Sequence, residues 1–218
     1  TQTSNVSIKE SESAVIFEQL SVKKPTGEIL IKDLNLHLPQ GSSVLIKGAS
    51  GAGKTTLLRT VAGLWSFSEG TVHCPQHNAL FLSQKPYLPQ GRLIDALYYP
   101  EVAPADVDLA GAAETMQKVQ LGHLADKLEQ ENDWMRMLSL GEQQRLSFAR
   151  LLMHKPRVAF LDEATASMDE GLEDAMYRLL RSEMPSTTII SVGHRSTLQP
   201  HHENQLISNP TDQIWRLV

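Results

Sequence analysis

The segment from residue 48 to residue 55 constrains this chain more than any other part of its sequence. It reads Gly48-Ala49-Ser50-Gly51-Ala52-Gly53-Lys54-Thr55 and fits the pattern G-x-x-x-x-G-K-[ST]. Residues 44–46 before it are apolar and β-prone, and residues 55–64 after it carry apolar side chains at helical spacing. This order of strand, glycine-rich loop and helix predicts a phosphate site, because glycines let backbone N–H groups curl around an anion and the helix presents its positive end.

The residues around the loop then take predicted roles. Lys54 is expected to reach the β- and γ-phosphates of a nucleotide, and Thr55 to offer its hydroxyl to Mg²⁺. Thr56, the next residue, is expected to contact the nucleotide as well.

Two adjacent carboxylates, Asp162 and Glu163, follow the apolar segment 158–161. Strands of an open α/β sheet deliver their carboxyl ends to the edge where ligands bind, so Asp162 is expected to hold Mg²⁺ through its water shell. Glu163 is the candidate general base for water attacking the γ-phosphorus. Taken alone, a solvated acidic turn explains the pair equally well, and the upstream phosphate loop favours the functional interpretation.

Residues 138–145 read Leu-Ser-Leu-Gly-Glu-Gln-Gln-Arg and predict the start of a helix. Ser139 followed three residues later by Glu142 is a capping box, so the positive end of this helix is a second place for an anion. By itself, the capping box would favour a plain surface helix cap.

The remaining pattern predicts an α/β fold with a mostly parallel central sheet. Apolar segments separated by Pro25-Thr26-Gly27 predict an antiparallel hairpin, and helical spacing predominates between residues 93 and 128. Strands are predicted at residues 15–20, 29–31, 34–38, 44–46, 78–82, 158–161 and 187–192, and further helices at 145–153 and 172–184. Trp65, Tyr98 and Tyr99 are assigned to the core.

Composition excludes two classes of function for the chain itself. Its 218 residues contain no apolar run of the 18 or so residues that a membrane helix needs, so it cannot form a transmembrane pore alone. A formal net charge of -5 argues against a protein that coats nucleic acid. Cys74, the single cysteine, is expected to be a buried or partly buried strand residue, with a functional thiol as the alternative. The polar residues 1–13 are expected to be a linker left from a longer protein.

Five ordered motifs resemble the nucleotide-binding domain of the ATP-binding cassette (ABC) family. The signature, usually LSGGQ, stands here as residues 138–142 and departs from the pattern at Leu140 and Glu142. Gln84 resembles the family's Q-loop glutamine, residues 167–169 its D-loop, and His194 its switch histidine. The resemblance covers about residues 16–217, nearly the whole chain.

The resemblance implies an ATPase with a P-loop core, an N-terminal antiparallel β subdomain and an inserted helical subdomain at about residues 86–155 of a 14–218 domain. Gln84 would contact Mg²⁺ and the γ-phosphate, and His194 would hold the attacking water with Glu163. The domain would form a head-to-tail homodimer around two Mg-ATP, in which Ser139 and Gly141 of one subunit close over ATP held by Lys54 of the other. Asp169 would bridge to the partner subunit.

The same resemblance implies a transporter. Trp134 and residues 138–145 and 191–195 look most like the peroxisomal fatty-acyl transporters of subfamily D and their bacterial relatives of the SbmA/YddA type. A membrane domain would then precede the ATPase on one polypeptide, at the cytoplasmic face of the bacterial inner membrane or of a peroxisomal membrane, with no nucleic-acid partner. A soluble ABC ATPase of DNA repair or translation is the alternative.

One family feature is missing from the sequence. Family members stack adenine on an aromatic residue shortly after the first strand, but residues 22–25 read Val-Lys-Lys-Pro. Only Phe17 or a lysine stem is nearby in the sequence, so we predict low base selectivity, with GTP also accepted.

Overall fold

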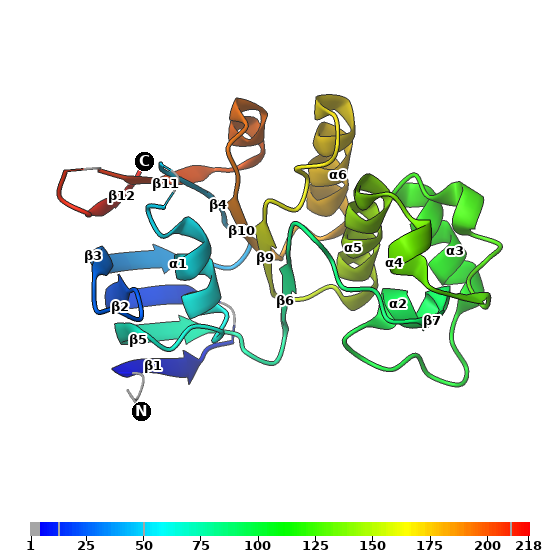
Figure 1. The fold of residues 1–218 in the computed structure, drawn as a ribbon, viewed down its shortest axis with the longest axis horizontal. Helices are drawn as coiled ribbons and strands as arrows, with labels where there is room; N and C mark the ends of the chain where they lie inside the picture. Colours follow the sequence, from blue (N-terminus) through cyan, green and yellow to red (C-terminus); the bar gives the residue numbers. More distant parts are fainter. Residues whose placement is uncertain (1–4, 13, 50, 210) are drawn as a thin grey trace. The chain divides into compact units, whose positions relative to one another are not determined.

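The structure, a computed structural model, describes residues 5–12, 14–49, 51–209 and 211–218 (Figure 1). The chain divides into two compact units, which are described separately below. The first unit contains the described parts of Thr1–Phe81, Pro156–Glu163 and Ser186–Val218, and the second contains Leu82–Lys155 and Ala164–Pro185.

A four-stranded sheet opens the first unit. Its order is β1 (Asn5–Glu10), β5 (Ser68–Cys74), β2 (Val15–Lys23) and β3 (Ile29–Leu38). The predicted hairpin is confirmed, since β2 and β3 are antiparallel, and the segment 34–38 is the second half of the same strand β3. Residues 5–10, expected to lie in a linker, instead form β1 and pair in parallel with β5, another strand that the pattern did not predict.

A six-stranded sheet forms the rest of the first unit's β structure. Its order is β12 (Trp215–Leu217), β11 (Asn204–Ser208), β4 (Ser43–Lys47), β10 (Thr188–Val192), β9 (Val158–Asp162) and β6 (Ala79–Leu82). The neighbours β11, β4, β10 and β9 are parallel, and β12 is antiparallel to β11. The predicted α/β fold with a mostly parallel sheet is therefore confirmed.

Helix α1 (Lys54–Val61) packs against strands of both sheets, including β2, β5, β9 and β10. Its buried Leu57 and Leu58 join side chains from both sheets in one core, to which Phe17 also belongs. Cys74 ends β5 and is 2% exposed, as expected of a buried strand residue, and burial raises the pKa of its thiol to about 12. The short 3₁₀ helix η2 (Ser196–His201) completes this unit.

The second unit is helical. Its elements are α2 (Leu93–Tyr98), α3 (Leu109–Lys118), the 3₁₀ helix η1 (Gly122–Leu124), α4 (Trp134–Met137), α5 (Leu140–His154), α6 (Glu170–Glu183) and the strand pair β7 (Gly91–Arg92) and β8 (Glu131–Asn132). Helix α5 contacts α2, α3 and α6. This unit extends beyond the expected 86–155 because it also contains α6. In the part of the chain that the structure describes, every helix is too short or too polar to cross a membrane.

Candidate nucleotide site

The phosphate loop joins β4 to α1, as the sequence predicts. Gly51 and Gly53 have φ angles of 81° and 95°, which residues with a Cβ rarely adopt. A Cβ on Gly48 would lie 2.7 Å from Ser208 Oγ, and one on Gly53 would lie 3.0 Å from Leu30 Cβ. The loop therefore has little room for side chains at these positions, which suits a backbone cradle for phosphate. Ser50, predicted to bind nucleotide, lies outside the described residues.

Lys54 opens α1 and is 7% exposed. Its Nζ donates to the carbonyl oxygen of Gly48 at 2.6 Å and lies 3.4 Å from Nδ1 of His194. Burial lowers the pKa of Lys54, while the carboxylates of Glu163 and Asp162 act in the opposite direction. The ammonium therefore lies beside the phosphate loop and near the acidic pair, where it can neutralise phosphate charge.

Asp162 and Thr55 supply two oxygen ligands of the kind that Mg²⁺ prefers. Thr55 Oγ1 donates to Asp162 Oδ1 at 3.2 Å, so both oxygens meet at the amino end of α1. Burial raises the pKa of Asp162, and the hydrogen bond from Thr55 opposes that rise. These side chains fit Mg²⁺, which protein sites commonly bind through one or two carboxylates together with the phosphates of a nucleotide. The described residues hold no group of three or more His, Cys, Asp or Glu suited to a metal.

Glu163 follows β9 in a left-handed conformation, with φ at 55°. Its N–H donates to the carbonyl oxygen of Val192 at 2.9 Å, which fixes the backbone at the end of β10. Its Oε1 lies 3.0 Å from Nε2 of His194. Burial raises the pKa of Glu163, and His194 lowers it in part. A carboxylate with a raised pKa is suited to accept a proton from water.

His194 connects Glu163 with Lys54. Its Nδ1 faces the ammonium of Lys54, a donor only, so Nδ1 acts as the acceptor and the ring proton belongs on Nε2. Nε2 then donates to the Glu163 carboxylate. The three predicted catalytic groups of the first unit therefore form one chain of contacts.

These side chains surround a pocket of about 310 Å³. Gly51, Gly53, Thr55 and Thr56 line it together with Lys54, Glu163, Val192 and His194. The same pocket is also lined by Lys24, Leu30 and Trp65. Trp65 packs partly buried against the hydrophobic core, as expected, and lines the pocket as well. The alternative of Phe17 as a base contact is excluded because Phe17 is 3% exposed and belongs to the hydrophobic core.

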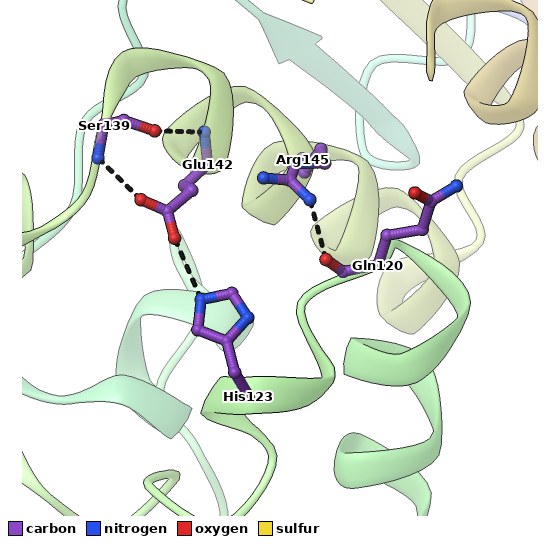
Figure 2. Close-up of polar contacts among 5 residues, drawn as sticks. All are labelled: Gln120, His123, Ser139, Glu142 and Arg145. Atoms are coloured by element: carbon purple, nitrogen blue, oxygen red, sulfur yellow. Dashed lines mark hydrogen bonds and ion pairs between the residues drawn. The ribbon is translucent and has the colours of Figure 1, made fainter. Parts of the chain in front are cut away.

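In the second unit, the predicted capping box is present at the start of α5 (Figure 2). Ser139 Oγ accepts from the Glu142 N–H at 3.1 Å, and Glu142 Oε1 accepts from the Ser139 N–H at 3.0 Å. The second carboxylate oxygen, Oε2, lies 3.0 Å from His123 Nε2. Burial acts to raise the pKa of Glu142, but hydrogen bonds from Ser139 and His123 outweigh it, and the pKa is lowered.

The signature helix is linked to two other predicted motifs through Gln144. This side chain is fully buried; its Nε2 donates to the Gln84 carbonyl oxygen at 2.8 Å and its Oε1 accepts from the Ser167 N–H at 3.0 Å. Gly141 also lies close to Ser167, because a Cβ on Gly141 would be 3.1 Å from the Ser167 carbonyl oxygen. Gln84 and Ser167 are therefore both joined to α5, the helix that Ser139 caps, within the second unit.

Asp169 caps α6. Its side chain accepts from the N–H of Leu172 at 2.7 Å, the geometry of a helix N-cap. The expected bridge to a partner subunit stays a prediction.

Sequence reasoning missed three residues that the structure brings to these sites: Gln144, His123 and Trp65. Gln144 carries a sequence signal, because a polar residue inside the apolar face of a helix needs buried partners. His123 and Trp65 carry none, since their neighbours come from distant parts of the chain.

Comparison with known proteins gives consistent matches. The model of the family described as "ABC transporter" matches residues 31–166. An "Uncharacterized ABC transporter ATP-binding protein" of Haemophilus influenzae is 62% identical over 215 residues, which is 99% of this chain and 36% of that protein. The human "Lysosomal cobalamin transporter ABCD4" is 39% identical, over 88% of this chain and 34% of that protein. Human "ATP-binding cassette sub-family D member 3" is 35% identical, over 90% of this chain and 31% of that protein. The chain thus spans about a third of the length of these relatives.

Proposed function

This chain belongs to the ABC transporter family of ATP-binding proteins, and from that premise we propose that it hydrolyses ATP with Mg²⁺ to drive transport by a membrane domain of the same protein. The single observation that carries the proposal is the chain of contacts from Gly48 through Lys54 and His194 to Glu163. These contacts place a cation (Lys54), a ring N–H donor (His194) and a base (Glu163) at one phosphate loop. Phosphoryl transfer needs this kind of positioning and charge neutralisation more than covalent chemistry.

The catalytic residues take complementary roles in the proposed reaction. Lys54 binds the β- and γ-phosphates, and Glu163 accepts the proton of the attacking water. His194 orients that water together with Glu163 and contacts the γ-phosphate. Mg²⁺ held by Thr55 and Asp162 would neutralise the phosphate oxygens, and the contact of Gln84 with Mg²⁺ stays a prediction.

The second half of each site comes from another copy in this proposal. The amino end of α5, with Ser139 and Gly141, would close over the γ-phosphate bound by the partner's phosphate loop, with Asp169 at the subunit boundary. Glu142 is already held by the Ser139 N–H and by His123, which leaves the Ser139 hydroxyl hydrogen and the next N–H groups to the phosphate. The departures at Leu140 and Glu142 are therefore compatible with the sandwich.

The membrane assignment has support from the relatives. Two of them are named as a transporter or as subfamily D members, and each is about three times as long as this chain. We infer a membrane domain that precedes residues 14–218, with the ATPase at the cytoplasmic face of the bacterial inner membrane. No observation favours the soluble alternative.

The head-to-tail arrangement has a direct test in mixed variants. Lys54→Ala and Ser139→Ala should each lose ATP hydrolysis when measured alone. A mixture should regain part of the activity, because one site of a mixed dimer then contains the intact Lys54 of one copy and the intact Ser139 of the other. Failure of the mixture to regain activity, with dimers present, would count against composite sites.

A further inference from the structure

The pocket at the phosphate loop has walls of two chemical kinds. One group consists of loop and acid–base residues, whose partners are phosphates and water. The other group consists of Lys24, Leu30 and Trp65, an aliphatic chain, a branched alkane and an indole ring. A nucleotide has the same division, with charged phosphates joined through a sugar to a flat, apolar-faced base.

The Trp65 ring is fixed in position. Its Nε1 donates to the carbonyl oxygen of Lys23 at 3.0 Å, and its centroid lies 5.5 Å from that of Phe67, with an angle of 65° between the rings. The N–H bond lies in the ring plane, so this hydrogen bond uses the edge of the indole and not its faces. The residue is half-buried, so part of the ring remains accessible at the pocket.

Lys24 and Leu30 line the pocket together with Trp65, and we call these three residues the base wall. The ammonium of Lys24 pairs with Glu28 at 2.8 Å, and its methylene stem is apolar. Leu30 has no polar side-chain atom, and the N–H of Trp65 is already used by Lys23. The base wall therefore offers Trp65 and Leu30 to the face of a base, and among these three side chains only the Lys24 ammonium, paired with Glu28, has unused donors.

We infer that Trp65, supported by Leu30 and the stem of Lys24, is the residue against which the base of the nucleotide stacks. The inference rests on the proposed function, since it concerns the same pocket, and it adds a specificity determinant that follows α1 and that the sequence pattern did not indicate. Every base has a π-face, so stacking of this kind tolerates different bases. The wall selects for a nucleotide over a bare polyphosphate and distinguishes poorly between adenine and guanine.

Calorimetric titration of the 218-residue chain with three magnesium-bound probes tests the inference: ATP, GTP and inorganic tripolyphosphate. The wild-type chain should bind ATP and GTP with affinities within about threefold of each other and both more tightly than tripolyphosphate. Trp65→Ala should weaken ATP and GTP binding by about tenfold or more, the usual effect of losing a base stack, and should leave tripolyphosphate binding unchanged. Trp65→Phe should retain most of the affinity for nucleotides.

Trp65→Leu provides a second variant if Trp65→Ala melts early, because it keeps apolar volume and removes the ring. Equal losses for nucleotides and tripolyphosphate would mean that the ring only shapes the pocket, which overturns the inference. Unchanged ATP affinity in both variants also overturns it. A wild-type chain that binds none of the probes refutes the proposed function and the inference with it, whereas equal wild-type affinity for ATP and tripolyphosphate refutes the base wall alone.

Tryptophan fluorescence gives an independent readout that needs no hydrolysis. A base stacked on Trp65 should quench its emission when ATP is added. The test uses a Trp215→Phe background, because Trp215 lies against Gly48 of the phosphate loop. In that background the quench should disappear with Trp65→Phe and persist with the matched control Trp134→Phe, whose ring is buried in the second unit. Loss of the quench in the Trp134 variant and its retention in the Trp65 variant would contradict the assignment.

Discussion

The carboxylate of Glu163 lies 3.0 Å from Nε2 of His194. Glu163 directly follows β9 and His194 follows the neighbouring parallel strand β10, so the order of these strands in the sheet creates the pair. Burial raises the pKa of Glu163, and the histidine holds that rise back.

A pH profile of ATP turnover follows from this pair. Glu163 acts as a base only when deprotonated, so kcat should fall as the pH drops through its pKa, which is raised above 4.5. His194→Ala removes the partner that lowers this pKa, so the acid limb of the profile should move to higher pH, together with a lower maximum. The matched control is His37→Ala, an exposed histidine of β3, which should keep the wild-type profile. If the acid limb does not move in His194→Ala, His194 does not influence the pKa of Glu163, which would contradict the prediction.

The capping box predicts a pH-dependent contribution to stability. Glu142→Ala should lower the free energy of unfolding by about 1 kcal/mol at neutral pH, because the Ser139 N–H and His123 lose the carboxylate that accepts from them, while the Ser139 cap itself remains. The pKa of Glu142 is lowered in the folded chain, so its charge stabilises above the unfolded value of 4.5 and this part is lost as the pH falls through the folded pKa.

Urea unfolding at neutral and acidic pH measures this difference. Glu142→Gln is the matched control, since a glutamine can still bond the Ser139 N–H but carries no charge. Its penalty should be smaller than that of alanine, and both penalties should shrink at acidic pH, because the wild-type chain then loses the contribution of the Glu142 charge. A penalty for Glu142→Ala that is the same at both pH values would contradict the role of the carboxylate charge.

Gln144 should affect both stability and turnover. Gln144→Ala removes a buried side chain and its two part-buried hydrogen bonds, to the Gln84 carbonyl and from the Ser167 N–H, at a cost of about 1 kcal/mol or more. Because the same contacts hold the Gln84 and 167–169 segments to the signature helix, turnover of the folded variant should fall several-fold. Gln117→Ala, on the exposed face of α3, should change the unfolding free energy by less than about 0.5 kcal/mol. If Gln144→Ala is destabilised but turns over ATP at the wild-type rate, the Gln144 side chain contributes to stability alone, and the predicted effect on turnover is wrong.

Much of the fold was predictable from local patterns. The phosphate loop, the parallel strands after it and the capping box at Ser139 each have a short-range signal, and the structure has all three. Residues 5–10 escaped prediction because their strand is polar and its partner β5 lies more than sixty residues along the chain. The strand β11 was missed because it has no regular apolar alternation, and β12 because its three residues are too few to show a pattern.

The candidate site also contains residues that sequence motifs identify and one that they do not. Lys54, Thr55, Asp162, Glu163 and His194 belong to motifs and were identified from sequence. Trp65 was not, because its place at the pocket depends on a hydrogen bond to Lys23 and on the neighbouring Lys24 and Leu30. Contacts between residues that are distant in sequence have no periodicity, so only the folded chain brings them together.

The most direct test of the central claim is ATP turnover by Glu163→Gln. This variant keeps the shape of the side chain and removes the base, so turnover should fall by at least about 100-fold. ATP binding should persist, and size-exclusion chromatography with light scattering should show a dimer that accumulates with ATP. Glu170→Gln, an exposed carboxylate in the first turn of α6, is the matched control and should turn over ATP at the wild-type rate. Wild-type turnover by Glu163→Gln would contradict the assignment of Glu163 as the catalytic base.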